Sequence, residues 1–149
     1  MKNEIKTILQ ETFYGPEGNS SWYTEAKKES GLIGTVSRIS AREASLDIDG
    51  TTIAAHTHHT MYHITVCKNT IKNVDQEKDW SISWKIKQVD EEEWNEIQKG
   101  LEREYNELIE LIEHRELSSI ALTIIFANLA HSAYHLGALR QLIKRINKD

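Results

Sequence analysis

Hydrophobic residues recur every three or four positions along most of this chain, which is the spacing of one face of an α-helix. With one proline and seven glycines in 149 residues, few positions break the pattern, and the long segments between them have helical rather than alternating periodicity. The sequence therefore predicts an all-α fold. It contains no linker or internal repeat, so we expect a single domain over 1–149.

Four longer helices are expected from the apolar stripes and their end signals. They are predicted over about residues 3–14, 51–73, 90–116 and 118–146. Gly15-Pro16 ends the first, and Asp90 with Glu93 forms a capping-box pattern at the start of the third. Ser118 or Ser119 begins the fourth. Amphipathic helices bury their apolar stripes against one another, so we expect a four-helix bundle.

Two connecting stretches are less regular. In residues 17–50, Ser30 and Ser40 are candidate N-caps for short helical segments. Residues 74–89 are expected to form a loop that packs onto the bundle through its tryptophans, and all four tryptophans are interpreted as packing anchors: Trp22, Trp80, Trp84 and Trp94. A loop of this length often covers a functional site.

Composition and charge narrow the function. The net charge is −5, and no basic cluster is longer than Lys27-Lys28, which argues against a nucleic-acid partner because neutralising phosphates requires a basic face. A single cysteine, Cys67, excludes an internal disulfide and is consistent with a reducing compartment. The first ten residues lack the apolar run of a signal peptide, and no stretch approaches the roughly 20 apolar residues of a membrane span. We therefore expect a cytoplasmic protein without a membrane partner.

Six of the seven histidines fall on two of the expected helices: His56, His58, His59 and His63 on the second, and His131 and His135 on the fourth. On the fourth helix they belong to one stripe of inward positions, namely Ile120, Ile124, Ala127, His131, His135, Ala138 and Leu142. At a spacing of four residues, two imidazoles rise from adjacent turns of one face. Two neutral ring nitrogens can then reach a common cation.

His56, His59 and His63 share one face of the second helix, whereas His58 is rotated by about 100° and is expected in solvent. These three histidines span roughly 10 Å of helical rise, so only one or two of them can join the pair on the fourth helix at a single ion. The alternative is that each ring is a hydrogen-bonded core residue. Imidazoles buried without partners would each cost about 1–3 kcal/mol, and metal ligation removes much of that cost. The pattern therefore favours a shared divalent-metal site.

Several parts of this sequence also resemble the DinB-like (DinB/YfiT) superfamily of bacterial four-helix bundles. The resemblance is carried by Thr52 to His59, by the motif His-x-x-Tyr-His-x-Gly-x-x-Arg-Gln at His131 to Gln141, and by residues 79–84 with 90–94. It covers roughly residues 51–142. In that family one histidine of helix two and two of helix four hold a divalent metal, commonly zinc or nickel, which implies His59, His131 and His135 as ligands. His56 and His63 flank His59, so either could replace or join it.

The histidine pattern and the resemblance together leave two hypotheses for the function. The family includes metal-dependent thiol transferases, which join a low-molecular-weight thiol to an electrophile, and proteins described as hydrolases. One hypothesis is therefore an enzyme whose metal activates a thiol or water, with His56 or His63 as general base or as a partner of a ligand, and Tyr134 as hydrogen-bond donor. The other is a non-catalytic metal-binding or stress-response module, with a shell closed by His63 or with a decayed site. The family also implies a homodimer.

Overall fold

The computed structural model describes residues 1–147 and is all-helical over them. Its helices are α1 (Lys2–Phe13), α2 (Leu32–Val36), α3 (Ala41–Ala44), α4 (Ile53–Ile71), the 3₁₀ helix η1 (Ile82–Trp84), α5 (Glu91–His114) and α6 (Ser119–Ile146). The all-α prediction is confirmed for this part of the chain, and each of the four longer helices lies within about two residues of its predicted bounds.

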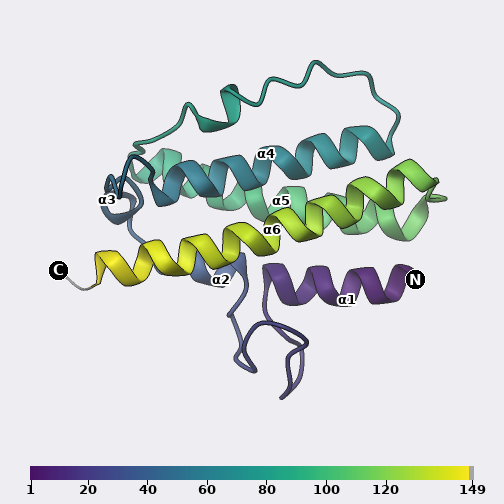
Figure 1. The fold of residues 1–149 in the computed structure, drawn as a ribbon, viewed down its shortest axis with the longest axis horizontal. Coiled ribbons are helices and arrows are strands. Elements are labelled where there is room, and N and C mark those ends of the chain that lie inside the picture. The colour runs from purple at the N-terminus through teal and green to yellow at the C-terminus, as the bar shows by residue number, and fades with distance from the viewer. Residues whose placement is uncertain (148–149) are drawn as a thin grey trace.

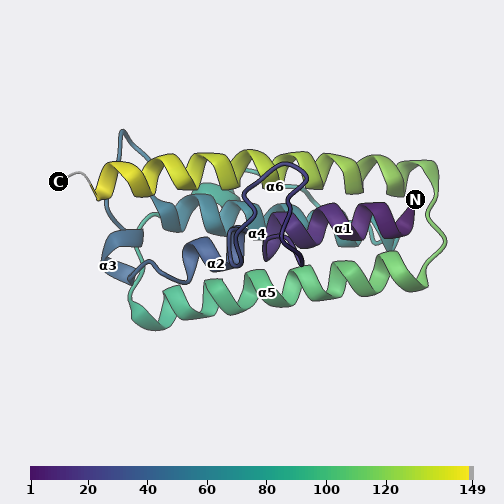
Figure 2. The same ribbon diagram turned by 90° about the horizontal axis from the view of Figure 1, so that it is seen from below.

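The longer helices α1, α4, α5 and α6 lie side by side (Figure 1). α4 packs against both α5 and α6, and α1 also contacts α5 and α6. Seen from below, α1 and α2 lie end to end between α5 and α6 (Figure 2). The core between these helices consists of buried aliphatic and aromatic side chains, among them Leu9, Phe13, Ile64, Leu101 and Leu139.

Local capping determines where several helices begin. The predicted caps Ser40, Asp90 and Ser118 are present, and each side chain accepts a hydrogen bond from a backbone N–H of the following turn. Ser30 is not a cap, because α2 begins two residues later and the Ser30 hydroxyl donates to the carbonyl oxygen of Glu25 instead.

The buried face of α6 differs from the predicted stripe. Ile120 is 60% exposed and Ala127 is exposed, whereas the buried residues of α6 are Ala121, Ile125, Asn128, Ser132, His135, Leu136, Leu139 and Leu142. Apolar residues surround most of this helix, so their spacing alone does not fix which face points inward.

By length and composition α6 also meets the criteria for a membrane span, which we did not expect from the sequence; core helices commonly meet them too.

The tryptophans divide into two kinds. Trp94 is buried and its Nε1–H donates to the carbonyl oxygen of Ile39 at 2.7 Å, as expected of an anchor. Trp22 is 76% exposed, so its prediction as an anchor is wrong. Backbone hydrogen bonds fix this segment instead, because the buried Glu11 carboxylate accepts hydrogen bonds from the N–H groups of residues 22, 23 and 24.

The connection from α4 to α5 is the predicted loop, interrupted by η1. It runs back along α4 (Figure 1), where the backbone N–H of Asp79 donates to the Tyr62 hydroxyl and η1 contacts α4. At its far end, the Ser45 hydroxyl and the backbone of Val89 exchange two hydrogen bonds. These attachments place η1 beside the part of α4 that carries the histidines.

Candidate metal centre

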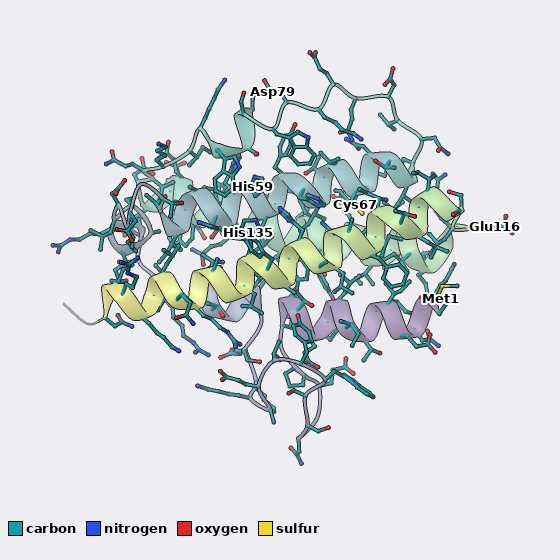
Figure 3. The ribbon with its side chains drawn as sticks, viewed as in Figure 1. Met1, His59, Cys67, Asp79, Glu116 and His135 are labelled. Carbon is teal, nitrogen blue, oxygen red and sulfur yellow. The ribbon has the colours of Figure 1, made fainter. Side chains whose placement is uncertain are left out.

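Three histidine rings meet between α4 and α6. His59 on α4 and His131 and His135 on α6 each offer a ring nitrogen within 4.8 Å of the other two. The Nε2 atom of His131 lies 3.0 Å from Nε2 of His59 and 3.1 Å from Nε2 of His135. Figure 3 labels His59 and His135 on the facing sides of the two helices. The structure thus brings together three histidines that could hold a metal ion.

The loop fixes the protonation of His59. Nδ1 of His59 lies 2.7 Å from Oγ of Ser83, and the Ser83 hydroxyl donates its hydrogen to the carbonyl oxygen of Trp80 at 2.6 Å. Because that hydrogen is already used, Ser83 Oγ can only accept, so His59 carries its proton on Nδ1. A neutral His59 therefore points an unprotonated Nε2 at the other two rings.

One of the three Nε2 lone pairs has no hydrogen-bond donor unless the three rings share a cation. A hydrogen on Nε2 of His131 can point along only one of its two contacts, toward His59 or toward His135. If His135 donates to His131 instead, Nε2 of His59 has no donor. A metal ion would satisfy all three nitrogens at once, so the donor set fits one.

The spacing of the nitrogens also suits a common ion. Zn–N bonds of about 2.0–2.1 Å put two nitrogens about 3.3–3.4 Å apart in a tetrahedral shell and about 2.9 Å apart at right angles. The distances of 3.0 and 3.1 Å lie between these values. Two of the three nitrogen–nitrogen distances thus already suit a shared cation, and the third is within 4.8 Å.

His56 supports His135 from the side away from the cluster. Their Nδ1 atoms are 2.8 Å apart, so one proton lies between them. When His135 donates that proton, its Nε2 keeps the lone pair that a metal requires. A hydrogen-bond acceptor on the second nitrogen is the usual way in which a protein orients a histidine ligand.

His63 is held in a different position. Its ring stacks on His131 with centroids 3.9 Å apart and planes 17° apart, and its Nδ1 lies 2.9 Å from Nδ2 of Asn128. The ligand group found among residues 1–147 comprises His59, His131 and His135 alone, so His63 lies outside it. Three buried polar atoms on the adjoining stretch of α6 have no partner: Oδ1 of Asn128, Nδ1 of His131 and Oγ of Ser132.

Burial keeps the histidines neutral. It is the largest cause that lowers the pKa of His59 to about 4 and those of His131 and His135 to about 3, and repulsion between neighbouring imidazoles adds to it. Burial also lowers the pKa values of His56 and His63. Neutral imidazole is the form that binds a metal, so the site is ready for one at pH 7.

Aromatic side chains surround the cluster. Trp84 stacks on His59 with centroids 4.0 Å apart and planes 18° apart, Trp80 contacts both His59 and His63, and Tyr134 stands edge-on to His135.

A cavity of about 540 Å³ lies elsewhere, between α1, α5 and residues 16–22, and none of the site histidines lines it. The candidate metal centre is therefore separate from that cavity.

Sequence reasoning missed the contributions of the loop. His58 is half-buried, and its Nδ1 lies 3.1 Å from the backbone carbonyl oxygen of Ser83, so the expectation that it is in solvent is wrong. Ser83 and Asn128 were not predicted at the site either, because serine and asparagine have no periodic signal. The roles proposed for His56, His63 and Tyr134 in catalysis stay predictions.

Comparisons with protein-family models, curated proteins and solved structures find no match to this chain.

Proposed function

We propose that this chain is a four-helix bundle of the DinB-like kind that binds one divalent ion, zinc or nickel, and acts as a cytoplasmic metal-dependent enzyme. Its ligands would be His59, His131 and His135, and its substrate a low-molecular-weight thiol or a molecule attacked by water. The meeting of three Nε2 atoms, one of them held unprotonated by Ser83, carries this proposal. A homodimer is part of the proposal through the family resemblance alone.

The protein's own residues would divide the work. When bound, the metal would act as a Lewis acid that lowers the pKa of a thiol or water. Ser83 would orient His59, and His56 would orient His135. His56 is half-buried and has a lowered pKa, so it is neutral at pH 7, but its one lone pair accepts the proton of His135; to act as a general base it would have to give up that contact. Tyr134 is 72% exposed, which leaves its hydroxyl free to donate to a substrate.

An open site fits the contacts better than a closed one. A shell of four imidazoles would require His63 to leave both its stack on His131 and its contact with Asn128. Three neutral ligands also leave the full charge of a divalent ion uncompensated, which favours an anion such as a thiolate in the remaining positions.

A turnover assay tests the enzymatic proposal. The thiolate displaces bromide from monobromobimane, forming a C–S bond and releasing bromide. Bacillithiol, cysteine and glutathione would each be assayed with zinc-loaded, nickel-loaded and metal-free protein. We expect a rate above background with at least one thiol, only with metal present, and none with His131→Ala. If no thiol gives a metal-dependent rate, and a panel of esters and amides gives none either, the enzymatic proposal is wrong.

A further inference from the structure

Three aromatic side chains with large exposed areas surround the histidine cluster. Trp84 is 36% exposed, Trp80 is 41% exposed and Tyr134 is 72% exposed. Each lies against a candidate ligand, with ring centroids 4.0 and 6.4 Å from His59 for the two tryptophans and 5.2 Å from His135 for the tyrosine. The tryptophans come from the loop and the tyrosine from α6. A ligand approaching these histidines from solvent would therefore meet aromatic surface contributed by two separate elements.

One face of Trp84 is covered by an imidazole. It stacks on His59, and its indole stands at 87° to His56 with centroids 5.2 Å apart. More than a third of the residue remains exposed, and because His59 already covers one face, a ligand could stack only on the other. A planar group stacked there would lie parallel to the His59 ring and one indole thickness from it.

The charges near the cluster decide which kind of planar group fits. Within the described residues, no carboxylate is hydrogen-bonded to the clustered histidines, whose partners are serine, asparagine, a backbone carbonyl and one another. A cationic ligand would therefore find no carboxylate bonded to these rings that could offset its charge, although aromatic surroundings often bind cations. A divalent ion on three neutral imidazoles would repel it further. A neutral ring, in contrast, gains the full benefit of stacking.

We infer that the substrate of this site carries a neutral, planar aromatic group, which stacks on the exposed face of Trp84 while its reactive atom reaches the three histidines. This inference deepens the proposed function and rests on it for the reaction, but the stacking itself needs no metal. Trp80 and Tyr134 would limit how the ring lies.

The first test uses metal-free protein. Binding of 2-naphthol and of cyclohexanol is measured by equilibrium dialysis for the wild type, Trp84→Leu and Trp84→Phe, with the remote, exposed Trp22→Leu as matched control. We expect the wild type and the control to prefer 2-naphthol by about tenfold, which corresponds to about 1.4 kcal/mol. Trp84→Phe should keep part of this preference and Trp84→Leu should lose it. Equal preferences in all four proteins would overturn the inference, as would tight binding of benzyltrimethylammonium.

The second test separates this inference from the proposed function. Acetohydroxamate can bind only through a metal, whereas 2-naphthohydroxamate can bind through the metal and the aromatic surface. The ratio of their affinities for zinc-loaded protein is compared within each variant, so that any loosening of the metal site cancels. We expect a ratio of about ten in the wild type and near one in Trp84→Leu. If acetohydroxamate fails to bind, the open metal site is wrong; if it binds and the ratio is near one in the wild type, the aromatic group is wrong.

Discussion

Nδ1 of His59 lies 2.7 Å from Oγ of Ser83, and the hydrogen of that hydroxyl is committed to the carbonyl oxygen of Trp80. The loop thus determines which nitrogen of a candidate metal ligand is free. His59 belongs to α4 and Ser83 to η1, so the candidate metal centre depends on how the α4–α5 connection lies over the helices.

Ser83→Ala should weaken metal binding without unfolding the protein. Loss of the hydrogen-bond acceptor frees the His59 ring to rotate and to change its tautomer, and loss of such a partner typically costs about 10–100-fold in metal affinity. Competition with a chromophoric zinc chelator measures the change. Ser81→Ala is the matched control, because Ser81 lies in the same loop and bonds to Asp79 rather than to a histidine. Equal affinities for the two variants would contradict the role of Ser83.

His63→Ala should keep one metal ion per chain. His63 contacts the flat face of His131 and not the shared nitrogens, so its loss removes stacking but no ligand. We expect the zinc affinity to fall by less than about tenfold, against a fall of about a hundredfold or more for His135→Ala. X-ray absorption of the zinc-loaded variant should show the same number of nitrogen ligands as the wild type. Loss of one nitrogen would instead make His63 a ligand.

The metal-free protein should lose stability as the pH falls from 7 to 5. An unfolded histidine titrates near 6.5, whereas the folded pKa is about 4 for His59 and about 3 for His131 and His135, so the unfolded chain binds more protons in this range. For one histidine with the pKa shift of His59, the free energy of unfolding would fall by about 2 kcal/mol from pH 7 to pH 5. Thermal unfolding at each pH measures the effect. His135→Phe should reduce the slope; a stability independent of pH would contradict the burial of neutral rings.

Lys68→Met should destabilise the protein more than Glu107→Gln. The Lys68 side chain is 5% exposed and pairs with Glu104 at 2.9 Å, whose side chain is 13% exposed, whereas that of Glu107 is 48% exposed. Removing Lys68 leaves the largely buried Glu104 carboxylate without its charged partner, which lowers the free energy of unfolding by about 3 kcal/mol. The pair with the more exposed Glu107 contributes less than about 1 kcal/mol. Urea unfolding distinguishes the two. Equal midpoints would mean that Lys68 does not hold α4 to α5.

The parts of this fold that follow from nearby residues could be predicted from the sequence. The caps at Ser40, Asp90 and Ser118 need only the next three residues to form, and helical spacing needs only neighbouring turns. The inward face of α6 could not be predicted in this way, because Asn128 and Ser132 are buried while the apolar Ile120 is exposed. Which face is buried depends on the other helices.

In the candidate site, too, features set by nearby residues could be predicted from the sequence, and contacts between distant residues could not. The spacing of His131 and His135 is local, and the expectation that His59 would meet them required only that two helices pack together. The contact between Ser83 and His59 joins residues 24 positions apart through an irregular loop, which no periodic pattern encodes. The exposure of Trp22 has a similar origin, because hydrogen bonds from the backbone to Glu11 hold that segment and leave its side chain free.

The most direct test of the metal centre is a zinc titration of untagged, metal-free protein in competition with a chromophoric chelator. We predict one ion per chain for the wild type and for His114→Ala, whose ring is exposed on α5, and an affinity lower by about a hundredfold or more for His131→Ala. Equal zinc binding by the wild type and His131→Ala, or no stoichiometric binding by either, would contradict the account.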